Sequence, residues 1–134
     1  MKRCDRIDKH KPFNILSIDG GGILGLYSAE LLTLIEKELF KNGSTFSSKF
    51  NLIAGTSTGG IIALALALGC FPAQISELYK LHGEKIFHKS YFNYLFKNWI
   101  FTNRYSSLSL QNALIEFFGN KTVKDCKTNI CIPA

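Results

Sequence analysis

Apolar and polar positions divide the chain into short apolar runs and longer periodic segments. Three mainly apolar runs have the length and composition of buried strands: residues 13–18, 52–54 and 129–132. Four segments are predicted as helices: residues 26–41, the wholly apolar run 61–68, the segment that begins at Pro72, and the segment from Ser107 or Ser109 to Phe118. Alternating strands and helices imply right-handed crossovers and a parallel sheet covered on both faces, a three-layer α/β/α fold.

Two of the helical segments are amphipathic. In 26–41 the apolar side chains share one face and the charged ones take the other; the apolar set is Tyr27, Leu31, Leu34, Ile35 and Leu39. In the segment from Pro72 the corresponding set is Ile75, Leu78, Tyr79 and Ile86. Residues 44–49, between the first helix and the second strand, are predicted to form a polar loop.

The chain reads as one domain, because 134 residues are too few for two. Residues 1–12 are charged and aperiodic, so we expect a flexible lead-in before a domain over 13–134. Residues 87–105 are crowded with aromatic rings interleaved with Lys and Arg. That stretch fits core packing over the sheet or a cap that contacts lipid. Three strands are few for such a sheet, which suggests an incomplete piece of a larger domain.

Charge and composition restrict the partners and the compartment. The formal net charge of +6 and the pI of about 9.2 suit an anionic partner such as a phospholipid surface or nucleic acid, or simply a solvated basic surface. The four cysteines have no metal spacing, and Cys70 and Cys131 sit in apolar surroundings, which indicates buried free thiols and a reducing, cytoplasmic compartment. The lead-in lacks a signal-peptide core, and 61–68 is too short to span a bilayer, so we expect peripheral membrane contact at most.

Candidate chemistry begins at Gly55-Thr-Ser-Thr-Gly59. This G-x-S-x-G follows a predicted strand and precedes a predicted helix, which is the context of a nucleophile elbow. Gly55 and Gly59 allow strand and helix to approach closely, and Ser57 takes a strained backbone position above the helix N-terminus. The pattern therefore predicts Ser57 as the nucleophile of an acyl transfer.

A second glycine motif, Gly20-x-Gly22-x-x-Gly25, follows the first strand. It has the pattern of a dinucleotide loop, but the second strand ends without the acidic residue that would hold a ribose, and no P-loop lysine is present. In a parallel sheet this loop and the elbow would instead share one edge. We then expect the N–H groups of Gly20, Gly21 and Gly22 to form an oxyanion hole.

These motifs resemble the patatin-like phospholipase family. The likeness is carried by Asp19-Gly-Gly-Gly-Ile-Leu-Gly25 and by Phe50-Asn-Leu-Ile-Ala-Gly-Thr-Ser-Thr-Gly-Gly60, and it continues more weakly to the end of the sequence. It covers only the first part of a patatin-like domain. The resemblance implies a lipid acyl hydrolase that acts on phospholipids or other acyl lipids with a Ser–Asp dyad. It implies no metal or cofactor, and no nucleic acid partner is expected.

The sequence departs from the family pattern in two places. Leu24 stands where the family often has a basic residue. The dyad acid of the family is an Asp in a downstream Asp-Gly, whereas Asp125, the one aspartate after Ser57, is followed by Cys126. We therefore expect the dyad Asp beyond the end of this sequence. The alternative is a catalytically incomplete fragment that keeps the fold and lipid binding.

Other residues are also candidates for the general base. The pairs Glu77 with His82 and Glu84 with His88 keep the Ser–acid–His order of an α/β-hydrolase, and Asp125 is a third candidate. All follow the elbow helix at positions from which reaching the serine would be fortuitous. Surface or structural roles are the simpler interpretation for them.

Overall fold

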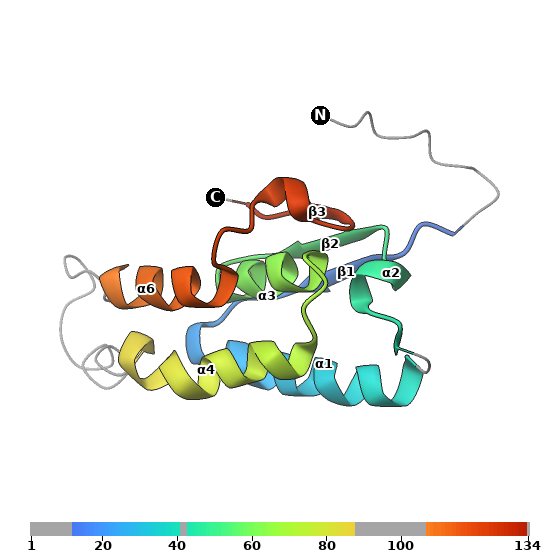
Figure 1. Cartoon of the computed structure of the whole chain (residues 1–134). Coiled ribbons are helices and arrows are strands. Elements are labelled where there is room, and N and C mark those ends of the chain that lie inside the picture. Colours follow the sequence, from blue (N-terminus) through green and yellow to red (C-terminus); the bar gives the residue numbers. More distant parts are fainter. Residues whose placement is uncertain (1–11, 41–42, 88–106, 134) are drawn as a thin grey trace.

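A parallel three-stranded sheet organises the chain. The computed structural model describes residues 12–40, 43–87 and 107–133 (Figure 1). For residues 84–87 and 107 it describes the backbone alone. The strands are β1 (Ile15–Ile18), β2 (Leu52–Gly55) and β3 (Asn129–Cys131), hydrogen-bonded in the order β1-β2-β3. Leu16 pairs with Ile53, which pairs with Ile130. The predicted α/β class with a parallel sheet is confirmed.

The four predicted helices are present, with small changes of boundary. They are α1 (Gly25–Leu39), α3 (Thr58–Ala67), α4 (Pro72–Phe87) and α6 (Ser107–Phe118). Three shorter elements join them: η1 (Gly22–Leu24), α2 (Phe46–Lys49) and η3 (Val123–Asp125). In Figure 1 α1 and α4 run alongside each other, while α3 lies next to the sheet.

The described helices pack against one face of the sheet. Because the strands follow one another in sequence order, both right-handed crossovers fall on the same side. Ile18 and Ile53 are buried there, in one apolar cluster with Ile62 of α3. On the opposite face Ile15 is 56% exposed. The described residues thus form the sheet and one helical layer, and a cover on the other face stays a prediction.

The buried side of α1 differs from the one expected. Tyr27 is 72% exposed and Leu34 is 59% exposed, whereas Ala29 and Leu32 enter the core. Because α1 must pack against both α4 and α3, a small residue at position 29 permits the close approach that a leucine would prevent. Thr33 is also buried, and its hydroxyl donates to the carbonyl of Ala29 at 2.8 Å, which satisfies it. The apolar spacing alone identified the helix but not its inner face.

Residues 44–49 are not wholly a loop, as the sequence had suggested. Thr45 and Ser48 form a capping box that starts the short helix α2. Phe46 is buried and packs edge-on against Phe40 and stacked on Phe50. This aromatic group closes the core at the start of β2, opposite the end of that strand where the glycine motifs lie.

Three further expectations have mixed outcomes. Cys131 is exposed and Cys70 is only half-buried, so the prediction of two buried thiols was wrong; β3 is short and its Cys131 side chain faces outward. Most of the aromatic stretch 87–105, residues 88–105, lies outside the described residues, as does most of the lead-in. Within the described ranges, none of the helices has the length and apolar character needed to cross a bilayer.

Candidate active site

The turn between β2 and α3 places Ser57 in an unusual backbone conformation. β2 ends at Gly55 and α3 begins at Thr58, so only Thr56 and Ser57 make the turn. Ser57 has φ 51° and ψ −123°, and no other non-glycine residue in the described ranges has a positive φ. Such a conformation costs about 1–3 kcal/mol and is typical of functional sites. The side chain of Ser57 is exposed at the N-terminus of α3.

Close backbone contacts explain the glycines of the elbow. A Cβ on Gly55 would overlap the carbonyl group of Gly59, and a Cβ on Gly59 would overlap the carbonyl oxygen of Ile18, at the end of β1. The first turn of α3 therefore lies directly against the ends of both strands. This approach brings the elbow next to the loop that leaves β1, as the parallel topology had led us to expect.

Hydrogen bonds from the glycine loop to two threonines join the loop to the elbow. The N–H of Gly20 donates to the Thr56 hydroxyl at 3.2 Å, and the N–H of Gly21 donates to the Thr58 hydroxyl at 3.2 Å. An ideal Cβ on Gly20 would lie 2.7 Å from the Cβ of Ser57. The threonines on either side of Ser57 thus hold the loop against the serine, a role that the sequence analysis missed although the Thr-Ser-Thr pattern was visible.

This arrangement changes what the three loop glycines can offer to an oxyanion. Gly20 and Gly21 already have acceptors for their N–H groups, at the long end of the hydrogen-bond range. For the N–H of Gly22, which has φ 59°, no acceptor lies within hydrogen-bond distance in the described part of the chain. The first N–H groups of α3, on Thr58 and Gly59, have no acceptor within their own helix. The oxyanion role of Gly20, Gly21 and Gly22 stays a prediction.

Gly25 and Leu24 occupy opposite sides of the loop. Gly25, the last motif glycine, is buried at the start of α1 against the ring of Tyr79 from α4, and an ideal Cβ there would lie 2.9 Å from Cζ. Leu24 extends over Gly21, where an ideal Cβ would lie 3.4 Å from it, and is 63% exposed. The rim of the loop is therefore apolar where the family often carries a basic residue.

His82 and Asp125, two of the candidate bases, have partners other than Ser57. The Nε2 of His82 lies 3.7 Å from Glu116 on α6, so His82 joins α4 to α6. Asp125 accepts from the N–H of Thr122 at 2.7 Å and from its hydroxyl at 2.9 Å, and these bonds lower the pKa of Asp125. Glu84 and His88 fall where side chains are not described. Within the described residues the Ser57 hydroxyl has no hydrogen-bonded base.

Comparison with known proteins identifies the family of this chain. A family model described as Patatin-like phospholipase matches residues 16–133. The chain is 35% identical over 123 residues to a cGAMP-activated phospholipase of Pseudomonas aeruginosa, covering 91% of this chain and 36% of the relative. It is 30% identical over 147 residues to Patatin-like protein 2 of Oryza sativa subsp. indica, covering 94% of this chain and 35% of the relative. A cUMP-AMP-activated phospholipase of Escherichia coli is 33% identical over 120 residues, covering 90% of this chain and 33% of the relative.

The parallel α/β fold carries a strained serine beside a glycine loop at one edge of the sheet. The chain belongs to the patatin-like phospholipase family. It spans about a third of the length of these relatives.

Proposed function

We propose that this chain carries the nucleophile and the oxyanion-binding loop of a serine acyl hydrolase that acts on membrane lipids. The observation that carries the proposal is Ser57 itself, an exposed serine with φ 51° at the N-terminus of α3, facing the glycine loop. Membership of a phospholipase family and the names of the relatives support hydrolysis of lipid esters.

The reaction would proceed by acyl transfer. The Ser57 Oγ attacks the carbonyl carbon of the ester while its proton passes to a base. The tetrahedral intermediate collapses, the bond to the alcohol oxygen breaks, and that oxygen takes the proton back from the base. Water then attacks the acyl-serine by the same route, which releases the fatty acid and restores the hydroxyl.

The base would be the dyad aspartate of the family, in an Asp-Gly pair that this sequence lacks after Ser57. Without it, the serine hydroxyl is a weak nucleophile near neutral pH. The competing proposal, a catalytically incomplete fragment that retains the fold and lipid binding, follows from the same absence in the sequence.

The charge that develops on the substrate oxygen would be met by backbone donors. The N–H of Gly22, which has no acceptor among the described residues, and the N-terminal dipole of α3 support this role. The N–H groups of Gly20 and Gly21 would add to them if the oxyanion displaces the threonine hydroxyls, since an anion is a stronger acceptor. Each donor of this kind contributes about 3 kcal/mol to transition-state stabilisation.

The surface beside the loop fits an apolar substrate. Ile23, Leu24 and Tyr27 follow the loop directly and all three are exposed. An exposed apolar rim next to a reactive serine can take up acyl chains or touch a lipid surface, and the net charge of +6 favours anionic lipids.

A fluorophosphonate probe tests the proposal without a particular lipid. We expect slow labelling of the 134-residue chain at Ser57, because the glycine loop is present and the dyad aspartate is not, and we expect labelling to vanish in Ser57→Ala. Ser17→Ala is the matched control, because Ser17 is an exposed serine on the neighbouring strand β1. Absence of labelling in a chain whose circular dichroism shows a folded protein would reject the nucleophile assignment for this polypeptide and favour the incomplete fragment.

A further inference from the structure

Tyr79 contacts both the elbow and the glycine loop, from their buried side. It lies on α4, is 5% exposed, and its hydroxyl donates to the carbonyl oxygen of Thr58 at 3.1 Å. Its ring covers Gly25, where an ideal Cβ would lie 2.9 Å from both Cζ and the hydroxyl oxygen. Thr58 is the residue after Ser57, and Gly25 is the last glycine of the loop. One side chain therefore bridges the two segments that would have to keep their spacing during catalysis.

The bridge continues through Thr58 to the loop itself. While the main chain of Thr58 accepts the Tyr79 hydroxyl, its side chain accepts the N–H of Gly21. A carbonyl in the first turn of a helix already accepts one intrahelical hydrogen bond, so the bond from Tyr79 adds a second. Burial raises the pKa of Tyr79 to about 12, so the phenol stays a neutral donor throughout the physiological range.

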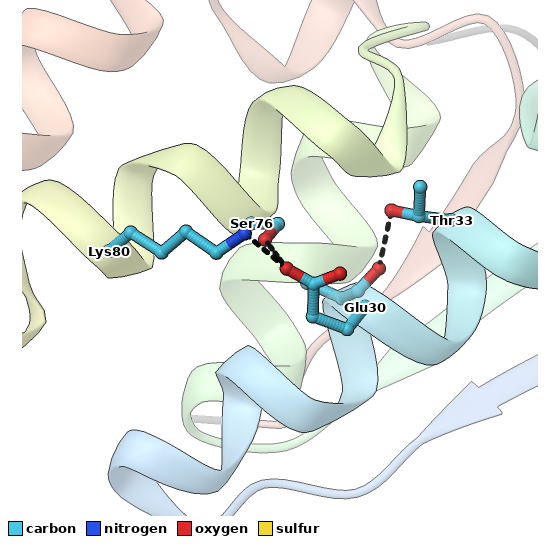
Figure 2. Close-up of polar contacts among 5 residues, drawn as sticks. Glu30, Thr33, Ser76 and Lys80 are labelled. Atoms are coloured by element: carbon cyan, nitrogen blue, oxygen red, sulfur yellow. Dashed lines mark hydrogen bonds and ion pairs between the residues drawn. The ribbon is translucent and has the colours of Figure 1, made fainter.

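Polar contacts between α1 and α4 hold Tyr79 in place. Figure 2 shows the Glu30 carboxylate of α1 between Ser76 and Lys80 of α4. Ser76 donates to Glu30 at 2.5 Å, and the ammonium of Lys80 lies 2.5 Å from the same oxygen. Lys80 and then Ser76 lower the pKa of Glu30, so the carboxylate is charged at neutral pH. Lys80 and Ser76 lie one residue and three residues from Tyr79 in the sequence. Their contacts with Glu30 therefore fix the position of α4 along α1 close to Tyr79.

We propose that Tyr79 is a positioning residue for Ser57: through Thr58 and Gly25 it fixes the distance between the elbow and the glycine loop. The inference rests on the proposed function, because it assigns Tyr79 to the same reaction. Tyr79 touches no reacting atom, and its effect is exerted through the backbone at Thr58 and through the packing of Gly25.

Tyr79→Phe tests the hydrogen bond, because it keeps the ring and removes only the hydroxyl. We expect the maximal rate of fluorophosphonate labelling at Ser57 to fall roughly fivefold or more, which matches the loss of about one hydrogen bond. The probe concentration for half-maximal rate should stay unchanged. Thr128→Val is the matched control, because it also removes one hydroxyl-to-carbonyl hydrogen bond, from Thr128 to Phe50 at the opposite end of β2, and the variant should label at the rate of the unmodified chain.

A second control separates positioning from general stability. Ile75→Val removes one methylene group from the core on the same helix α4, one turn before Tyr79, and leaves the Tyr79 hydroxyl in place. It should lower the midpoint of thermal unfolding with no change in labelling rate. A Tyr79→Phe variant that labels at the unmodified rate, or an Ile75→Val variant of equal stability that labels as slowly as Tyr79→Phe, would overturn the proposal.

Amide hydrogen exchange tests the role of Tyr79 independently of the nucleophile assignment. If the unmodified chain is not labelled at all, the nucleophile assignment fails, while the positioning role is still decided by exchange at Gly20 to Gly22. Faster exchange there in Tyr79→Phe than in Ile75→Val supports the role of Tyr79. Equal exchange in the two variants rejects it.

Discussion

The N–H of Gly21 donates to the hydroxyl of Thr58 at 3.2 Å, across 37 residues of sequence. This bond joins the loop after β1 to the first residue of α3. Together with the bond from Gly20 to Thr56, it makes the glycine loop and the serine turn a single unit. The separation between Ser57 and any oxyanion donor in the loop is therefore controlled by threonine side chains as well as by the strands.

Thr58→Val should loosen this unit. Valine has nearly the shape of threonine but cannot accept the N–H of Gly21, which is left without its partner. We expect a loss of about 1 kcal/mol in the free energy of unfolding, measured with urea, and faster amide exchange at Gly21. Thr58→Ser is the control, because it retains the hydroxyl. If valine is as stable as serine at this position, the bond to Gly21 contributes nothing to holding the loop.

Ser57→Gly should separate stability from reactivity. Glycine adopts φ 51° and ψ −123° with little strain, so the variant should unfold with a free energy roughly 1 kcal/mol higher than the unmodified chain. Ser57→Ala keeps the strain and should show no such gain, while neither variant should react with a fluorophosphonate. Equal stability of the glycine and alanine variants would show that the backbone at residue 57 is not strained.

The local elements could be read from the sequence, but the contacts that assemble the site could not. The strands, the four longer helices and the adjacency of the loop and Ser57 follow from apolar runs, glycine spacing and the parallel-sheet rule. Whether Ala29 or Leu34 faces the core depends on how closely α1 approaches α3 and α4, which periodicity does not encode. The bonds of Gly21 to Thr58 and of Tyr79 to Thr58 join residues 37 and 21 positions apart.

Leu24→Asp should weaken contact with lipid and leave the fold intact. Leu24 is 63% exposed at the rim of the loop, so its replacement should change the free energy of unfolding by no more than about 0.5 kcal/mol. Loss of one buried leucine side chain at a lipid surface should reduce binding to vesicles of anionic phospholipid roughly tenfold in a sedimentation assay. Leu39→Asp is the control at the far end of α1, with 69% exposure. Equal losses in both variants would point to the added negative charge and not to the rim.

Stability at alkaline pH should depend on Tyr79. Burial raises the pKa of its phenol from 10.0 to about 12, so the folded state holds the proton more tightly than the unfolded state does. A raised folded-state pKa contributes stability that is complete below about pH 10 and is lost as the pH climbs toward 12. Between about pH 9.5 and 11.5, a range set by the two pKa values, the unmodified chain should therefore lose more unfolding free energy than Tyr79→Phe, because phenylalanine has no proton to release. The urea midpoint of unfolding measures this loss. Tyr27→Phe, which lacks an exposed phenol, should follow the unmodified chain. Parallel curves for the unmodified chain and Tyr79→Phe would mean that the phenol meets solvent in the folded protein and is not held at the carbonyl of Thr58.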